Sequence, residues 1–452
     1  MSSAADLSLF DASAALRSGA FTSRALVEAV LQRIKERERL HAFTHVAADA
    51  LAQADAADAR LARGEDPGRL CGLPIAVKDL IDVQGQPATS GSRVLAGRIA
   101  ERDADAVARL RAQGAVLIGK LATYEFAMVG PDMNLPDPPA RNPWNLAHIT
   151  GGSSSGAASV VAGGLVRLAI GTDTGGSIRS PAAYCGCVGL KPSYERVSRD
   201  GAFPLSPSLD HTGPLAATVA EAALALDAMT PDNEEWQPAS ALIGQSIEGL
   251  RIGFARSWFA DDPKASPALI RAMDEAAATF SMLGARVSLT DLPDYQPYEA
   301  AASIILHAEA LAEHVALIAK NQSAYGRPTL QCLAFGAVIS DEDLAMARRA
   351  VKPLTEAMTS AMADVDVILT ATTLTPALPF SAFDGEKAVW TPMRTIAFNL
   401  TGQPALSVPC GFENGLPLGA QLVAAIGAED VLCRVGHAFE QATDHSVQRP
   451  LF

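Results

Sequence analysis

The sequence predicts an α/β protein in which a mostly buried β-sheet packs against helices. Six short apolar runs have the length and composition of strands, and helical stretches separate most of them: residues 73–77, 115–119, 165–170, 250–254, 365–369 and 405–408. Strands that alternate with helices are typical of this class. With 452 residues and 49% hydrophobic content, the chain can bury a large core. We find no internal repeat and no linker rich in Pro, Gly or Ser, so residues 1–452 are expected to form a single large domain.

The first seventy residues are expected to form a helical N-terminal segment. An alanine-rich run at 47–62 continues a helical pattern that begins earlier in the segment. In that earlier stretch the apolar side chains fall on one helical face, opposite Arg, Lys and Glu: Leu26, Val27, Val30, Leu31 and Ile34.

Beyond residue 70 the pattern changes from helical to alternating. The strands at 73–77 and 115–119 flank a helix around 104–113. Residues 220–360 are mainly helical and contain no cluster of glycine and hydroxyl residues. That composition is typical of a cap or substrate-pocket region and not of a catalytic centre.

Net charge and cysteine content exclude several functional classes. A net charge of −14 and a pI of about 5.1 argue against nucleic acid or an anionic membrane as the main partner. Six scattered cysteines show no zinc-ligand spacing, which favours reduced, mostly buried thiols in a cytoplasmic protein. The amino terminus lacks a secretory pattern, and Arg167 and several glycines interrupt the longest run of small apolar residues. We therefore expect no membrane partner.

Two turns rich in glycine and hydroxyl residues carry the most informative pattern. Residues 151–156 read Gly-Gly-Ser-Ser-Ser-Gly, and residues 171–179 read Gly-Thr-Asp-Thr-Gly-Gly-Ser-Ile-Arg. A small-residue apolar segment, 157–170, separates them. Glycine lets other atoms come close to the backbone N–H groups. Hydroxyls beside accessible N–H groups are what a nucleophile with an oxyanion hole requires.

Other sites with similar patterns do not fit. A phosphate-binding loop needs Lys and then Ser or Thr after its second glycine, and here two alanines follow. Residues 152–156 match the G-x-S-x-G elbow of α/β-hydrolases, with His437 available as a partner. An elbow follows an apolar strand, however, whereas residues 141–148 read as a loop. No serine lies three residues before a lysine, and the dispersed histidines form no H-E-x-x-H motif, so no metal site is expected.

Lys78 ends the strand at 73–77 and is followed by Asp79. A lysine in this position is usually a surface residue whose stem packs on apolar neighbours. Combined with the two turns, in which Ser153 and Ser177 lie twenty-four positions apart, it resembles the pattern of the amidase signature family of serine hydrolases. The resemblance covers most of the chain and continues in four further segments: 180–192, 208–214, 402–409 and 415–421.

This resemblance implies both a fold and a set of catalytic roles. The fold is a single large domain with a central mixed β-sheet covered by helices on both faces. The triad maps onto Ser177 as nucleophile, Ser153 as a bridging serine in a cis peptide, and Lys78 as base. The oxyanion hole would consist of backbone N–H groups of the second turn: Thr174, Gly175, Gly176 and Ser177. Supporting hydrogen bonds are expected from three neighbours, and no cofactor is implied: Ser154, Asp173 and Arg179.

The chain departs from the family pattern in two places. Ser155 stands where a glycine is common, a change that we expect to be tolerated. Residues 126–139 lack the usual Tyr-Gly and Asn-rich pattern, so the pocket entrance is expected to differ from that of the common members. Residues 300–340 and 390–392 are further candidates for the pocket wall. The substrate pocket is expected to include parts of this loop and of the first turn: Phe126, Met128, Gly130, Gly151 and Gly152.

Lysine can act as a base only when its amine is neutral. With an ordinary pKa of about 10.4, deprotonating it at pH 7 costs about 4.6 kcal/mol, at about 1.36 kcal/mol per pKa unit. Burial disfavours the charged form and lowers a lysine pKa by up to about 3–5 units. The apolar residues before Lys78 suit such burial. The side chain of Asp79 must point away, because a nearby carboxylate would restore the ammonium.

The sequence therefore favours an amidohydrolase that forms an acyl-enzyme on Ser177 and cleaves a small or medium, uncharged, hydrophobic or aryl amide. Carbamates (urethanes) and esters suit the same site, since all three offer a carbonyl and a leaving group. One alternative is the glutaminase subunit of a tRNA-dependent amidotransferase, which would need partner subunits. Another is a non-catalytic scaffold that kept the fold, which the intact Lys78, Ser153 and Ser177 argue against. We expect a cytoplasmic monomer or homodimer that acts on a small molecule, with no nucleic-acid partner.

Overall fold

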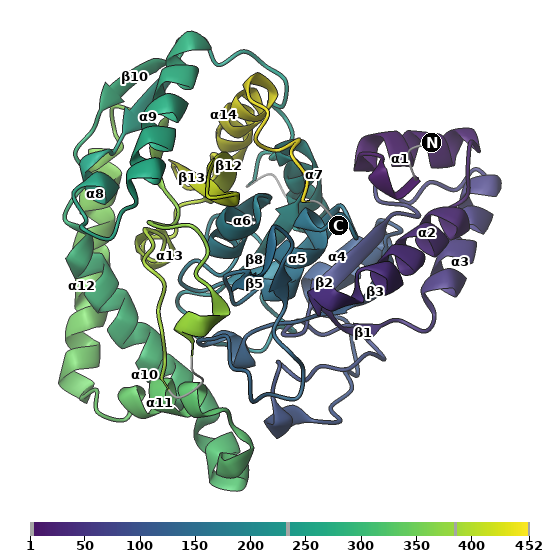
Figure 1. Ribbon diagram of the computed structural model, residues 1–452, viewed down its shortest axis with the longest axis horizontal. Coiled ribbons are helices and arrows are strands. Elements are labelled where there is room, and N and C mark those ends of the chain that lie inside the picture. The colour runs from purple at the N-terminus through teal and green to yellow at the C-terminus, as the bar shows by residue number, and fades with distance from the viewer. Residues whose placement is uncertain (1–3, 232–235, 384–386, 451–452) are drawn as a thin grey trace.

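The computed structural model describes residues 4–231, 236–383 and 387–450. In this part of the chain one long sheet of eleven strands crosses the molecule (Figure 1). A separate two-stranded hairpin, β4 (Arg141–Asn142) and β5 (Asn145–Ile149), lies outside it. From edge to edge the strands of the sheet are β1 (Phe43–Val46), β3 (Val116–Leu121), β2 (Pro74–Lys78), β6 (Leu168–Asp173), β8 (His211–Ala216), β7 (Val188–Lys191), β12 (Ala405–Glu413), β13 (Leu416–Ala424), β11 (Val367–Ala371), β9 (Arg251–Phe254) and β10 (Arg286–Leu289).

The sheet is mixed, as the resemblance implied. Strand β2 pairs in parallel with both β3 and β6, and β9 pairs in parallel with both β10 and β11. The strands in the middle of the sheet, from β6 through β8, β7, β12 and β13 to β11, pair antiparallel. Parallel pairs need crossover segments between their strands, and these connections bring the helices onto the sheet.

Helices cover both faces of the sheet, because successive residues of a strand point to opposite sides. Ile75 and Val77 of β2 belong to a buried apolar cluster with residues of α1, α4, α7, α9 and α14, whereas Ala76 joins a cluster with α2, α3, α5 and α6. The helices are α1 (Leu9–Ser18), α2 (Ser23–Glu36), α3 (Ala50–Ala62), α4 (Asp105–Ala112), α5 (Ser155–Ala162), α6 (Arg179–Cys185), α7 (Val219–Met229), α8 (Ser257–Ala260), α9 (Pro267–Met282), α10 (Tyr295–Asn321), α11 (Arg327–Gly336), α12 (Asp341–Ala361), α13 (Ala397–Leu400) and α14 (Glu429–Ala442).

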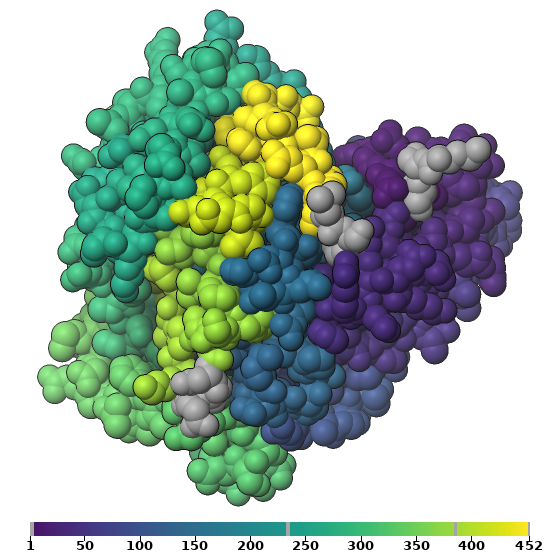
Figure 2. Space-filling view, viewed as in Figure 1, coloured from purple at the N-terminus to yellow at the C-terminus, as the bar shows by residue number. Residues whose placement is uncertain are grey.

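Helices α10, α11 and α12 form a lobe at the lower left of the molecule, coloured green in Figure 2. A third apolar cluster joins this lobe to the sheet through Ile368 of β11, Ala405 of β12 and Val423 of β13. Within the described residues α10 and its continuation, Tyr295–Ala324, have the length and apolarity of a membrane span. The same property suits a helix that packs in a protein core, and Tyr298, Ala302 and other residues of α10 are buried in this cluster.

The sequence predicted some elements and missed others. The six apolar runs correspond to β2, β3, β6, β9, β11 and β12, and the helix expected around 104–113 corresponds to α4. The expectation of a purely helical segment at 1–70 was wrong at Phe43–Val46, which forms the edge strand β1 against β3. Residues 220–360 are mainly helical but also contain β9 and β10. All six cysteines are free and buried, as expected.

Candidate active site

Lys78 lies at the end of β2 with its side chain fully buried. Because β2 pairs with β6, the amine reaches the polar end of β6 and the turn that follows it. Its Nζ donates to Ser153 Oγ and to Thr172 Oγ1, both at 2.7 Å. The structure therefore brings the expected base and the expected bridging serine into direct contact. Thr172, which the sequence analysis did not single out, completes the surroundings of the amine.

The amine of Lys78 has an unusual environment for a cation. Burial lowers its pKa from an ordinary 10.5 to about 7, although Asp173 and Asp210 act in the opposite direction. Asp79 turns away from it, as the argument required. The Asp79 carboxylate lies 3.0 Å from Lys120 Nζ and accepts hydrogen bonds from Thr89. Near neutral pH a large share of Lys78 is thus uncharged and able to accept a proton.

Ser153 follows a cis peptide bond, Gly152–Ser153, and is buried. The next residue, Ser154, joins the two glycine-rich turns. Its backbone N–H donates to Ser177 O at 3.2 Å, and its hydroxyl donates to Thr172 O at 3.0 Å. Ser154 thus makes the supporting contacts expected of it. Helix α5 begins at Ser155, whose hydroxyl donates to Ala122 O, so this departure from the family pattern is accommodated.

Ser177 lies half-buried in the turn that links β6 to α6. Asp173 shapes this turn, because its carboxylate accepts hydrogen bonds from the N–H groups of Gly176 (2.8 Å) and Ile178 (3.1 Å). Gly176 adopts a φ of +130°, and a Cβ there would come within 2.4 Å of Thr395 Oγ1. A glycine is therefore required at this position.

The four N–H groups expected to form the oxyanion hole differ in their surroundings. That of Gly176 is already bonded to Asp173, so it points into the protein and away from a substrate. The N–H groups of Thr174, Gly175 and Ser177 remain as donors for an oxyanion. The Gly175 carbonyl accepts a hydrogen bond from Thr395 Oγ1 at 2.6 Å, which fixes the orientation of the turn.

Asp173 and Arg179 form a fully buried ion pair beneath the turn, with 2.8 Å between Arg179 Nη2 and Asp173 Oδ1. Burial alone would raise the pKa of Asp173, but Arg179 and Asn399 hold it well below its usual range. Arg179 also donates to Asn399 Oδ1, Gln421 Oε1 and Thr395 O. The network ties the turn to α13 and β13, so both residues act by positioning Ser177.

A cavity of about 320 Å³ opens in front of Ser177. Of the expected pocket residues, Met128, Gly130, Gly151 and Gly152 line it. Phe126 does not, so that expectation was wrong. Its backbone has a φ of +49°, and its ring is fully buried against Phe203, His314 and Tyr325.

Several other residues of the pocket wall could not be placed from sequence. Leu306, Trp390 and Thr391 come from the two regions named as candidates, 300–340 and 390–392. The remaining members were missed, although spacing of three to four residues along α10 is the signal that relates several of them. These are Tyr124, Ala127, Val129, Ile149, Leu205, Tyr295, Glu299, Ser303, His307, Val389, Met393 and Ile396.

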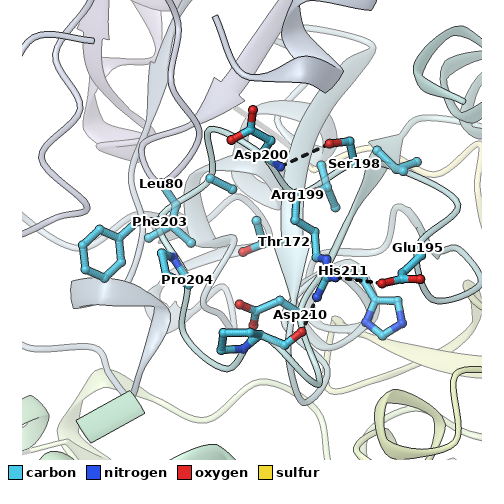
Figure 3. A pocket seen from close by; sticks show the side chains of 14 residues that line it. Leu80, Thr172, Glu195, Ser198, Arg199, Asp200, Phe203, Pro204, Asp210 and His211 are labelled. Atoms are coloured by element: carbon cyan, nitrogen blue, oxygen red, sulfur yellow. Dashed lines mark hydrogen bonds and ion pairs between the residues drawn. The ribbon is translucent and has the colours of Figure 1, made fainter. Parts of the chain in front are cut away.

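A second cavity, of about 450 Å³, lies close to Thr172 and is separate from the one at Ser177 (Figure 3). Asp210 and His211 are buried in its wall. Asp210 accepts a hydrogen bond from Thr174 Oγ1 at 2.6 Å, and burial raises its pKa to about 6. This wall therefore supports the first residue of the Ser177 turn from the side away from the substrate pocket.

Comparison with known proteins agrees with this geometry. A protein-family model described as Amidase matches residues 25–433. The chain belongs to the amidase family. It is 36% identical to one of the subunits of the glutamyl-tRNA(Gln) amidotransferase of Chromohalobacter salexigens, over 99% of both chains. The Amidase match confirms the family to which the motifs pointed.

Solved structures of amidases share the whole fold. The peptide amidase of Stenotrophomonas maltophilia is 30% identical, with a TM-score of 0.87 over 98% of both chains. A bacterial aryl acylamidase of the amidase signature family is 27% identical, with a TM-score of 0.88 over 98% of this chain and 99% of the other. The predicted single domain with a mixed, helix-covered sheet is thereby confirmed.

Proposed function

We propose that this amidase-family chain is a serine-dependent hydrolase that cleaves the C–N bond of a small or medium, hydrophobic or aryl amide through an acyl-enzyme on Ser177. The observation that carries the proposal is the buried Lys78 amine, with its pKa near 7, at 2.7 Å from Ser153 Oγ. An uncharged lysine in contact with a serine is suited to general-base catalysis.

In acylation, Ser177 Oγ bonds to the carbonyl carbon of the amide while its proton passes to Ser153, whose own proton passes to Lys78 Nζ. The N–H groups of Thr174, Gly175 and Ser177 stabilise the negative oxygen that forms, and one such donor is worth about 2.7–4 kcal/mol. The C–N bond then breaks as the proton returns from Lys78 through Ser153 to the leaving nitrogen.

Deacylation follows the same route in reverse. Water adds to the ester carbonyl and gives a proton through Ser153 to Lys78. The bond from the carbonyl carbon to Ser177 Oγ then breaks, and that oxygen recovers a proton along the same relay. The carboxylic acid leaves and the free enzyme is restored. A carbamate would instead give a carbamoyl-enzyme whose hydrolysis product loses carbon dioxide, and an aryl ester would release a phenol.

The lining of the 320 Å³ pocket supports an apolar substrate. Met128, Leu306, Trp390, Met393 and Ile396 supply large apolar surfaces. A pocket of this size and composition is typical of small-molecule sites. We propose that the chain acts in the cytoplasm, as a monomer or homodimer, on such a molecule.

The alternative is that the chain is the glutaminase subunit of a tRNA-dependent amidotransferase. The observation in its favour is full-length similarity to the amidotransferase chain of Chromohalobacter salexigens, at 36% identity. In that case the same relay would release ammonia from glutamine, and activity would require partner subunits. A scaffold without catalysis is the third reading, and it requires the Lys78–Ser153 contact to have no use.

The purified chain without partners separates these readings. It is assayed on a panel of aryl amides, carbamates and esters and on glutamine, with Ser177→Ala as the blank. We expect turnover of a neutral aryl amide and labelling of Ser177 by a fluorophosphonate. Hydrolysis of glutamine only after addition of co-purified partner subunits would establish the alternative. No labelling and no turnover under either condition would leave the scaffold.

A further inference from the structure

One face of α10 forms a long wall of the substrate pocket. Tyr295, Glu299, Ser303 and His307 follow one another at intervals of four residues, and Leu306 lies beside them. Residues spaced in this way share one side of a helix. All five line the cavity that also contains Ser177. The wall is therefore a single rigid element that faces the proposed nucleophile.

The charge of this pocket is one-sided. Among its lining residues that the structure describes, Glu299 is the one side chain with a formal charge at neutral pH, and no lysine or arginine is present. Glu299 is exposed and makes no hydrogen bond or ion pair with another described residue. Burial lowers the pKa of His307, so its ring is neutral, and its Nδ1 donates to Ser303 O at 2.7 Å. Both groups offer acceptors to a bound molecule.

The cations behind the wall are already occupied. Arg394 stacks on the Tyr295 ring at 4.6 Å, but its guanidinium is bonded to Asp262 and Trp258 O, each at 2.6 Å. Arg179 is held in its buried network with Asp173. A carboxylate in the pocket would thus meet Glu299 without a basic partner, and burying an unpaired charge is unfavourable.

Resting on the proposed hydrolase function, we infer that Glu299 is a specificity-determining residue that selects amides carrying a cationic group distal to the scissile bond. The substrate class is an aliphatic or aryl amide whose far end bears a primary or quaternary ammonium. Neutral amides are accepted, and amides ending in a carboxylate are rejected.

The size of the effect follows from Coulomb's law. A unit charge about 4 Å from a carboxylate in a water-like medium gains or loses about fivefold in binding. An ammonium substrate gains this factor and a carboxylate substrate loses it, so their kcat/KM values should differ by about 30-fold. Because Glu299 is exposed, added salt should reduce the difference.

The test uses 4-nitroanilides of straight-chain acids with three to six methylenes that end in a methyl, an ammonium or a carboxylate group. Wild-type protein is compared with Glu299→Gln, which removes the charge and keeps the shape. Glu313→Gln is the matched control, because Glu313 is an exposed residue of the same helix that does not line the pocket. We expect Glu299→Gln to bring the ammonium-to-carboxylate ratio close to one, mainly through KM, while turnover of the neutral amide and the Glu313→Gln ratio stay unchanged.

Failure of this inference can be distinguished from failure of the proposed function. Turnover of the neutral amide reports on the hydrolase itself. If no amide is hydrolysed, binding of the same compounds to Ser177→Ala, measured by calorimetry, still tests the charge preference. The inference is overturned if carboxylate-ended amides are used or bound as well as ammonium-ended ones, or if Glu299→Gln leaves the ratio intact.

Discussion

Replacing Lys78 with methionine would separate the catalytic use of the amine from its cost to folding. Methionine has a similar length and apolar character, so it fills the buried site without leaving a large cavity. The pKa of Lys78 is lowered from 10.5 to about 7. At about 1.36 kcal/mol per pKa unit, this drop corresponds to about 4–5 kcal/mol of destabilisation.

The pH dependence of this cost has a definite sign. Below pH 7 the lysine is charged in both the folded and the unfolded chain, so the native state carries the full penalty. As pH rises from about 7 to 10.5, the unfolded chain loses its proton as well and the penalty disappears. The free energy of unfolding of Lys78→Met, relative to wild type, should therefore fall by about 4 kcal/mol between pH 6 and pH 10.5.

Hydrogen bonding offsets part of the gain without changing its pH dependence. Methionine leaves the hydroxyls of Ser153 and Thr172 without their 2.7 Å partner. Each unpaired buried group costs about 1–3 kcal/mol at any pH. The other buried lysines, Lys120 and Lys191, titrate equally in both proteins and cancel in the comparison.

Urea unfolding at pH 6, 8 and 10, with initial rates on one neutral aryl amide at pH 7, measures both effects. Loss of a general base should lower kcat/KM by about 10²–10⁴-fold. A variant that keeps its rate within tenfold of wild type would refute the role of Lys78 as base. A stability difference that does not vary with pH would refute the lowered pKa.

The remaining predictions concern the serines, the buried ion pair and the pH profile of activity. Ser177→Ala should abolish turnover and fluorophosphonate labelling while changing stability by less than about 0.5 kcal/mol; labelling that persists would place the nucleophile elsewhere. Ser153→Ala should lower kcat/KM less than Lys78→Met does, measured on the same amide, and the reverse order would contradict the relay. Asp173→Asn removes the carboxylate that neutralises buried Arg179 and should cost about 3–5 kcal/mol in urea unfolding, so an unchanged midpoint would argue against the pair as a support. For a neutral substrate, kcat/KM should rise about tenfold per pH unit below about 7 and level off above it, because the uncharged amine of Lys78 is the active form, whereas a flat profile from pH 5 to 9 would argue against it.

The sequence was informative where chemistry is local. The two glycine-rich turns and Lys78 sit at the ends of apolar strands, and the parallel pairing of β2 with β6 brings them together. The same locality explains why β2, β3 and β6 were predicted as strands. By contrast, β8 reads His-Thr-Gly-Pro-Leu-Ala, in which glycine and proline hide the strand pattern. Edge strand β1 has only four residues, and its partly exposed side chains gave no apolar run.

The pocket depends on contacts between segments that are far apart in the sequence. Glu299 and His307 face Ser177 only because α10 packs against β11, β12 and β13 through a shared apolar cluster. Phe126 shows the reverse case, since it is adjacent to true pocket residues yet turns inward. Its positive φ and its aromatic neighbours on other elements decide this, and neither can be recognised from residues 124–130 alone.

The central claim is that the amine of Lys78 is uncharged in a large part of the protein near neutral pH. The most direct test is an NMR titration of protein labelled with ¹⁵N at the lysine side chains, with the Lys78 signal assigned by its absence from Lys78→Met. The account predicts a midpoint close to pH 7. A midpoint near the ordinary value of 10.5 would contradict it.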